Sequence, residues 1–125
     1  SIPDPTALST FEASRLDWSE ARAEAGALAL EATRRLLALR AASVVPLLES
    51  GFLGADRREA GDEALDITWR FRAGALALQA NFGARTKEAR VQEDMTVIWQ
   101  GPAAFDPSAG IPAWSAIFSV SSARG

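Results

Sequence analysis

The hydrophobic period of this chain changes near residue 44, and this change restricts the possible fold more than any other feature. Before it, residues 19–42 contain no proline, a single glycine and many of the strongest helix formers, Ala, Leu, Glu and Arg. After it, apolar residues recur at every second position, which is the period of a half-buried strand. The pattern predicts an α+β fold with one long N-terminal helix packed on an antiparallel β-sheet or a small β-sandwich.

The predicted helix has recognisable ends. Asp17 or Ser19 is suited to cap its start, and Pro46 is expected to mark its stop. The residues before it include two prolines and are expected to form an irregular lead. Two domains follow from this reading: the lead with the helix over 1–42, and an antiparallel β domain over 43–125.

Apolar residues lie on two sides of the predicted helix. At 100° per residue one stripe holds Leu28, Ala32, Leu36 and Leu39, and a nearly opposite stripe holds Leu30, Leu37 and Ala41. A helix that covers one sheet needs a single stripe, so two stripes predict burial between two bodies, one of which is absent from this chain. The alternative is that Ala and Leu are simply common in this composition.

The strongest strand signal is a β-hairpin over residues 64–82. Leu65, Ile67, Trp69 and Phe71 alternate with polar residues, and after the turn residues Ala73-Gly74 the alternation resumes to residue 82. Further strands are expected near 44–49, 87–92, 95–100 and 114–120. Breaks are expected at 51–54, 81–83 and 101–112, where glycine, proline and polar residues gather.

Composition excludes several classes of function. The chain has no Cys and no His, so disulfides, thiolate or imidazole metal sites and a Ser-His-Asp triad cannot form. Its formal net charge of -3 predicts no nucleic-acid partner. The sequence contains no run of ~18 apolar residues, which predicts no membrane partner, and the lack of Cys and of a targeting segment predicts a cytoplasmic location. The start at Ser1 without a methionine indicates a piece of a longer protein.

No set of residues in the sequence has the pattern of a catalytic site. The acidic pairs Asp62-Glu63 and Glu93-Asp94 are expected at solvated turns, since glycoside hydrolysis needs two carboxyls that face each other across a cleft. Lys87 lies in a polar stretch that would not lower its pKa. The glycines lack the spacing of a phosphate-binding loop. We therefore predict no catalytic, cofactor-binding or metal-binding residues and no cofactor.

Three tryptophans are candidates for a surface that stacks sugars. Trp69 shares its strand face with apolar residues and is expected in the core. Trp99 is expected there as well, because it follows Met95 and Val97 at alternate positions. Trp114 follows an apolar run and is expected to be partly exposed.

The lead segment carries a resemblance to a known family. Ile2-Pro3-Asp4-Pro5, then Thr10-Phe11-Glu12-Ala13-Ser14-Arg15-Leu16-Asp17-Trp18, then a helix ending in Leu36-Leu37-Ala38-Leu39-Arg40, is similar to the C-terminal part of maltooligosyltrehalose trehalohydrolases, glycoside hydrolases of the α-amylase superfamily. Two later stretches agree: residues 77–83 resemble the family's "LLVAANLG" strand and residues 112–115 resemble its closing "LPPWSV" strand. Arg15 replaces the usual Lys, and residues 43–63 match poorly.

The resemblance implies a function for the parent protein and a structural role for this chain. Family members hydrolyse the α-1,4 bond that joins trehalose to a maltooligosyl chain, with catalytic carboxylates on a TIM barrel that precedes this segment. The chain would then be a non-catalytic terminal helix and β domain, partnered by the missing barrel and reaching maltooligosaccharide only through the parent. Phe11, Leu16 and Trp18 would anchor the lead, and Asp17 would cap the helix or pair with Arg15.

Two other classes of function remain open. The chain could be an independent carbohydrate-binding module that uses Trp99 or Trp114, or a protein-interaction module that docks through its helix. The two apolar stripes also predict that the isolated chain can form a homodimer through the helix.

Overall fold

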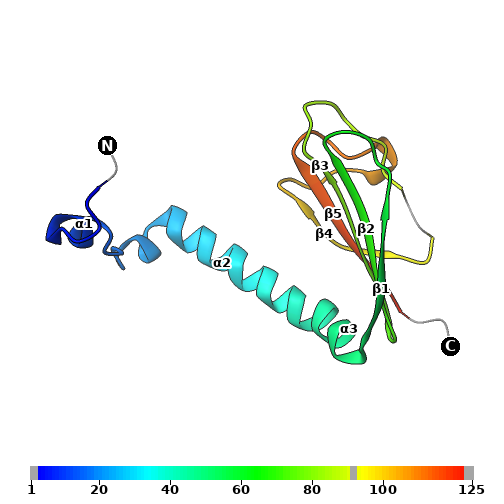
Figure 1. Cartoon of the computed structure of the whole chain (residues 1–125), viewed down its shortest axis with the longest axis horizontal. Coiled ribbons are helices and arrows are strands. Elements are labelled where there is room, and N and C mark those ends of the chain that lie inside the picture. The colour runs from blue at the N-terminus through cyan, green and yellow to red at the C-terminus, as the bar shows by residue number, and fades with distance from the viewer. Residues whose placement is uncertain (1–2, 91–92, 123–125) are drawn as a thin grey trace. The chain divides into compact units, whose positions relative to one another are not determined.

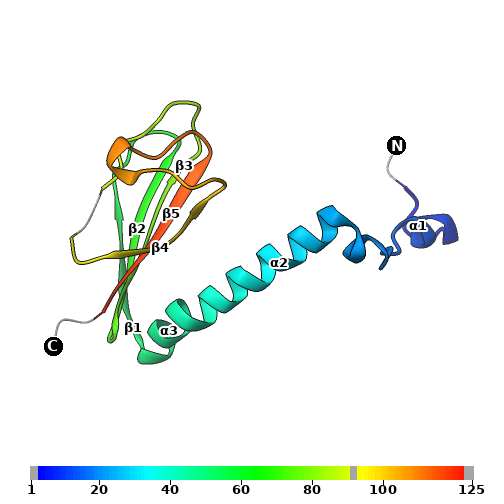
Figure 2. The ribbon, with the colours of Figure 1, turned by 180° about the vertical axis from the view of Figure 1, so that it is seen from behind.

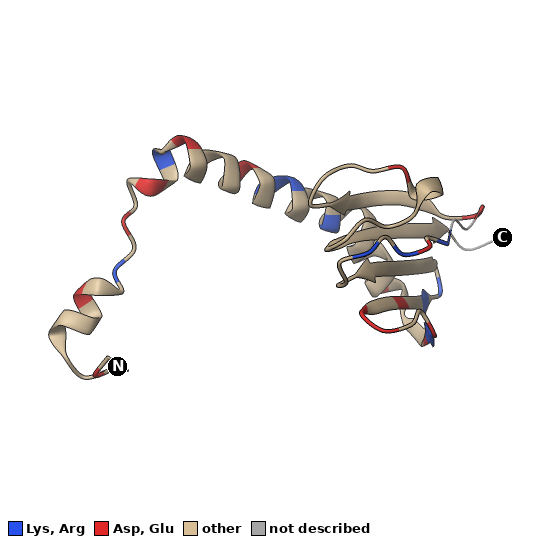
Figure 3. Cartoon of the chain, turned by 90° about the horizontal axis from the view of Figure 1, so that it is seen from above, with Lys and Arg blue, Asp and Glu red and all other residues tan. Residues whose placement is uncertain are grey.

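The computed structural model describes residues 3–90 and 93–122 (Figure 1). The chain divides into two compact units, Ser1–Leu37 and Ala38–Gly125, which are described separately below. Acidic and basic residues are mixed along the ribbon of both units (Figure 3). Within the described ranges, no helix has the length and apolar character needed to cross a membrane.

The first unit is helical. It contains α1 (Leu8–Ala13), the short 3₁₀ turn η1 (Glu20–Arg22) and most of α2 (Glu24–Leu39). The expectation of an irregular lead is therefore wrong for α1. Both prolines of the lead precede that helix, where a missing N–H breaks no helical hydrogen bond. The helix α2 starts five residues later than expected, because residues 20–22 form the separate turn.

The helical run continues past the residue expected to stop it. The π-helical turn η2 (Arg40–Val44) follows α2 directly, and α3 (Val45–Ser50) follows η2. Pro46 lies in the first turn of α3, where its lack of an N–H is tolerated. The predicted stop at Pro46 and the predicted strand near 44–49 are both wrong. The helix ends instead at Gly51, whose φ of 101° favours glycine.

The second unit is built on one antiparallel sheet (Figures 1 and 2). Its strand order is β1-β2-β3-β5-β4. The strands are β1 (Phe52–Arg58), β2 (Ala64–Phe71), β3 (Gly74–Asn81), β4 (Thr96–Gly101) and β5 (Ser115–Ser122). The predicted α+β class is confirmed, since a long helical run is followed by an antiparallel sheet, and the described strands form one sheet rather than a sandwich.

Most of the remaining strand predictions are confirmed, whereas the strand near 87–92 and the break at 51–54 are wrong. The hairpin over 64–82 and the strands near 95–100 and 114–120 are present. The predicted break at 51–54 lies largely inside β1, which forms because its backbone pairs with β2. Near 87–92 the structure shows an isolated bridge between Lys87 and Ile111 in place of a strand. Residues 91–92 of that prediction lie outside the described residues.

The apolar core lies between α3 and one face of the sheet. Leu47 of α3, Phe71 of β2 and Leu76 of β3 are buried together. Half-buried apolar side chains surround them: Val44, Trp69, Ile98, Phe118 and Val120. The expectation that Trp69 belongs to the core is confirmed, since it packs against this cluster. We call this side of the sheet the helix face.

Trp99 reaches the helix face because of a β-bulge. Between Val97 and Trp99 the register of β4 against β5 shifts, so Val97 lies opposite Ser119 while Trp99 lies opposite Phe118. The Trp99 and Phe118 rings are in contact, with centroids 5.9 Å apart. Trp99 is thus packed as expected, but the expectation that it shares a face with Val97 is wrong. An extra residue in one strand reverses the alternation from that point.

Candidate functional site

The acidic pairs lie at turns, as the sequence predicts. Asp62 and Glu63 occupy the connection between β1 and β2, and Glu93 and Asp94 occupy a turn before β4. No group of three or more acidic residues in the described parts of the chain is placed to hold a metal ion. The structure therefore brings neither predicted pair into a cluster of metal ligands.

Lys87 forms hydrogen bonds with two other loops of the β domain. Its Nζ donates a hydrogen bond to the backbone oxygen of Asp62 at 2.9 Å. Its backbone exchanges two hydrogen bonds with Ile111, at 3.0 and 2.8 Å. Both the side chain and the backbone of Lys87 are therefore used to join the β1–β2 connection and the segment before β5 to residues 85–90.

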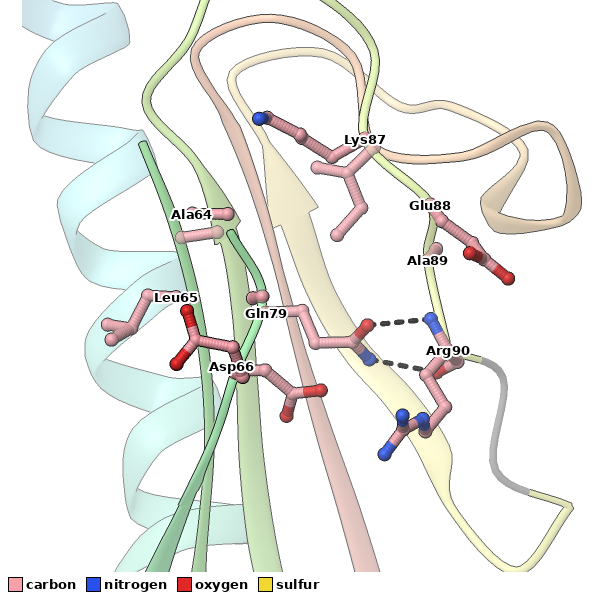
Figure 4. Close-up of a pocket in the computed structure, with 12 residues that line it drawn as sticks. Ala64, Leu65, Asp66, Gln79, Lys87, Glu88, Ala89 and Arg90 are labelled. Atoms are coloured by element: carbon pink, nitrogen blue, oxygen red, sulfur yellow. Dashed lines mark hydrogen bonds between the residues drawn. The ribbon is translucent and has the colours of Figure 1, made fainter. Parts of the chain in front are cut away.

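A pocket of about 540 Å³ opens on the face of the sheet opposite the helix face (Figure 4). Its floor includes Asp66 of β2 and Gln79 of β3, which lie opposite each other in register. The segment from Lys87 to Arg90 forms a wall. The Gln79 side chain holds this segment, because its Nε2 donates to the Arg90 oxygen at 2.8 Å and its Oε1 accepts from the Arg90 N–H at 2.7 Å.

The charges around this pocket are mixed. Asp66 is 9% exposed, and Glu59, Glu88, Lys87 and Arg90 also line the space. This volume is within the range of small-molecule sites. The pocket could not be predicted from the sequence, because Asp66 and Gln79 occupy ordinary polar positions of alternating strands.

Asn81, at the end of β3, is the most buried polar side chain described, at 1% exposure. Its Nδ2 lies within hydrogen-bond distance of three backbone oxygens, those of Arg85, Ile111 and Pro112, at 2.8, 3.0 and 2.9 Å. Its Oδ1 accepts from the Gly83 N–H at 2.9 Å. An amide has only two hydrogens, so one is shared. Asn81 thus holds in place the segment that follows β3 and the segment that precedes β5.

Trp114 is exposed, as expected. It is 68% exposed and has a φ of 55°, in the left-handed region that bulky residues rarely adopt. Glu63, with a φ of 59°, is the other non-glycine residue with a positive φ among those described. Phe82, next to Asn81, is 52% exposed. The exposure of Trp114 was predicted from the sequence, whereas the positive φ values of Glu63 and Trp114 were not.

Asp17 caps a turn rather than the long helix. Its Oδ1 accepts from the Ser19 N–H at 2.8 Å, just before η1. The hydroxyl and the backbone N–H of Ser19 lower the pKa of the Asp17 carboxyl. Ser108 lowers the pKa of Asp106 in the same way before the 3₁₀ turn η3 (Pro107–Ala109).

Trp18, the neighbour of Asp17, is 77% exposed. Whether it anchors the lead on a neighbour stays a prediction.

The sequence of the β domain matches a described protein family. The family model "Domain of unknown function (DUF3459)" matches residues 54–118, which is more than half of the chain. The chain belongs to the DUF3459 family. The matched region runs from β1 to the middle of β5 and so includes the pocket, Asn81 and the exposed Trp114. No curated protein matches the sequence.

A solved structure extends the comparison to nearly the whole chain. The DUF3459 chain is similar to part of a "Putative alpha Amylase" from Salmonella typhimurium, with a TM-score of 0.82 and 27% identity. The likeness covers 97% of this chain and 20% of that protein, so the chain spans about a fifth of the Salmonella protein's length. It is a domain that resembles the C-terminal, non-catalytic part of an α-amylase family protein. The predicted α-amylase association is confirmed at this level.

Proposed function

We propose that this chain is the non-catalytic C-terminal domain of an α-amylase family glycosidase and packs against the catalytic barrel of its parent. The observation that carries the proposal is the likeness over 97% of the chain to one fifth of an amylase-like protein. The barrel would supply the catalytic carboxylates, which the predicted acidic pairs of this chain do not replace.

The exposed apolar residues of α2 support the same proposal. Leu28 and Leu36 of one stripe are 66% and 47% exposed, and Leu30 and Leu37 of the other are 40% and 60% exposed. Burying a leucine side chain contributes about 1.5–3 kcal/mol, so a helix with four exposed leucines gains much from a covering partner. A neighbouring domain of the same polypeptide would cover these leucines in every copy of the protein, without the need for a separate partner.

For the parent enzyme we propose maltooligosyltrehalose trehalohydrolase activity, the hydrolysis of the α-1,4 bond that releases trehalose. Support comes from the lead motif, in which residues 2–18 resemble that family more specifically than other amylases. The substrate would be a maltooligosyl trehalose, bound by the barrel, and the parent would act in the cytoplasm.

The test uses the natural polypeptide that contains this chain. The full-length protein is expected to release trehalose from maltooligosyl trehalose, and the separate 125-residue chain is expected to release none, as measured by chromatography of the products. Deletion of the chain from the parent should expose apolar surface and lower the yield of soluble barrel.

Different results would reject different parts of the proposal. A parent that cleaves maltooligosaccharides without releasing trehalose would reject the trehalohydrolase assignment and keep the amylase association. A natural polypeptide that contains this chain but no catalytic barrel would reject the proposed role as the C-terminal domain of a glycosidase. Hydrolysis by the isolated chain would show that a catalytic site lies within it.

A further inference from the structure

The most buried acidic residue of the pocket opposite the helix face is Asp66. It is 9% exposed, whereas the other two acids that line the space, Glu59 and Glu88, are exposed. Its side chain lies on the pocket side of β2, because Trp69 and Phe71 of the same strand pack on the helix face and successive side chains alternate. Asp66 therefore belongs to the floor of the pocket and not to its rim.

The Asp66 carboxylate has no partner in the described structure. No described residue donates a hydrogen bond to it, and the ion pairs described join Arg35 to Glu31 and Arg70 to Asp56. Among the described residues, no fully enclosed side-chain oxygen or nitrogen lacks a hydrogen bond, so the unbonded Asp66 oxygens open into the pocket. An ionised carboxylate that is mostly removed from water and has no donor is costly. A ligand that brings a donor recovers this free energy.

The two basic residues that line the pocket do not neutralise Asp66. Lys87 directs its Nζ to the backbone oxygen of Asp62, at 2.9 Å. Arg90 is attached to the floor through its backbone, because the Gln79 amide bonds both its N–H and its oxygen (Figure 4). The exposed Arg90 side chain forms no ion pair with Asp66 in the described structure. The carboxylate thus stays available to a donor from outside.

The chemistry of the lining favours a cation that carries N–H donors. An anion would meet the Asp66 charge at the floor and be repelled. A divalent metal ion needs several oxygen ligands at once, and no three acids of the described residues are placed to hold one. An ammonium or guanidinium group needs only one or two acceptors and forms charge-assisted hydrogen bonds with a carboxylate.

We propose that this pocket binds a small organic cation whose ammonium or guanidinium group donates hydrogen bonds to the Asp66 carboxylate. The volume of about 540 Å³ accommodates a ligand of this class. Ile111, which is 3% exposed, and Ala89 give the carbon stem of the ligand an apolar surface. The Glu59 and Glu88 carboxylates at the rim attract the same charge. The proposal does not depend on the proposed function of the parent.

The test is calorimetric titration of the 125-residue chain with agmatine, which carries a guanidinium and a primary ammonium on a short carbon stem. Wild type is expected to bind agmatine with a Kd at or below about 1 mM. Tetramethylammonium has a positive charge but no N–H donor, and it should bind at least about tenfold more weakly. Pentanoate, an anion with a similar carbon stem, should show no binding.

Asp66→Asn removes the charge and keeps the shape of the side chain, and it should weaken agmatine binding by about tenfold or more. Asp56→Asn is the matched control, because it makes the same change of charge on the same face of the sheet, outside the pocket. Its affinity should stay within about twofold of wild type.

Amide chemical shifts of the wild-type chain give a second measurement, which decides the matter if Asp66→Asn fails to fold. Agmatine should shift the amide signals of residues 66, 79, 89 and 90 more than those of the helix α2. Shifts spread evenly over the chain would contradict a site in the pocket.

Other results would also overturn the proposal. The first is no binding of agmatine by wild type at about 10 mM, and the second is an equal loss in the two Asn variants. Equal affinity for tetramethylammonium would show attraction by charge alone, and displacement of agmatine by magnesium chloride at an equal concentration would show a metal site.

The source of the cation is tested with the natural polypeptide that contains this chain. It should bind agmatine as the 125-residue chain does. Binding by the chain alone would show that a basic side chain from elsewhere in the polypeptide fills the pocket, and the proposal of a small-molecule ligand would fall. Glucan hydrolysis is measured separately, so failure of this site leaves the proposed function standing.

Discussion

At the scale of single residues, Asn81 has the largest number of hydrogen bonds described for one side chain. Three backbone oxygens and one N–H depend on it, and it is 1% exposed. Leaving a buried polar group without a partner costs about 1–3 kcal/mol. We expect Asn81→Ala to lower the free energy of unfolding by about 3–5 kcal/mol, because water can replace only part of this network. Urea denaturation of the two chains measures the difference.

Gln100→Ala is the control for Asn81→Ala. The Gln100 Nε2 donates one hydrogen bond to the Phe105 oxygen at 3.0 Å. Its removal should cost about 1 kcal/mol, the usual net value of a single hydrogen bond. Equal losses in the two variants would show that Asn81 contributes no more than an ordinary side-chain hydrogen bond.

At the scale of elements, the helical run from residue 24 to residue 50 is buried only toward its end. No residue of α2 is buried, whereas Leu47 of α3 is 6% exposed and contacts the core of the sheet. We expect Leu47→Ala to destabilise the isolated chain by about 2–4 kcal/mol, since it leaves a cavity. Leu37→Ala, at a position 60% exposed, should change stability by less than about 0.5 kcal/mol.

Thermal denaturation followed by near-ultraviolet circular dichroism reports the sheet unit in both leucine variants. Hydrogen exchange adds a second reading, because helices without packing are marginal in water. Amides of residues 24–37 should exchange faster than those of β3. A loss of stability for Leu37→Ala comparable with that for Leu47→Ala would contradict the exposed position of α2.

At the scale of the whole molecule, the exposed leucines of α2 predict that the isolated chain self-associates. An isolated chain can cover an exposed stripe only with a second copy, and a two-fold contact buries the same stripe on both. Sedimentation velocity at rising concentration should show a monomer–dimer equilibrium. Leu37→Glu should weaken it by about tenfold if the stripe of Leu30 and Leu37 is the contact, and Leu36→Glu if the other stripe is.

Ala27→Glu is the control, because it adds the same charge on the polar side of α2, near Glu31 and Arg34. It should leave the equilibrium unchanged within about twofold. A chain that stays monomeric at about 1 mM would show that neither stripe drives association. The proposed barrel contact would then depend on the structural likeness and the lead motif.

Features that depend on local pattern could be predicted from the sequence. The hairpin over 64–82 follows from strict alternation and a glycine turn, and the long helix follows from residue type over more than twenty positions. The partial exposure of Trp114 could be predicted because it follows the run of residues 111–113 at the entry to a strand. The lead motif identified the α-amylase association, which composition alone could not.

Other features were decided by the tertiary structure, because they depend on neighbours that are distant in sequence. The glycines at 51 and 54 predict a break, yet β1 forms because β2 offers it a partner along its whole length. A bulge in β4 places Trp99 on the helix face, and a bulge is an insertion relative to another strand, so one strand's pattern cannot show it. The pocket residues Asp66 and Gln79 likewise become neighbours only through the pairing of β2 with β3. Sequence alone determined which segments are helix and strand where periodicity is strong, and strand pairing determined which side chains meet.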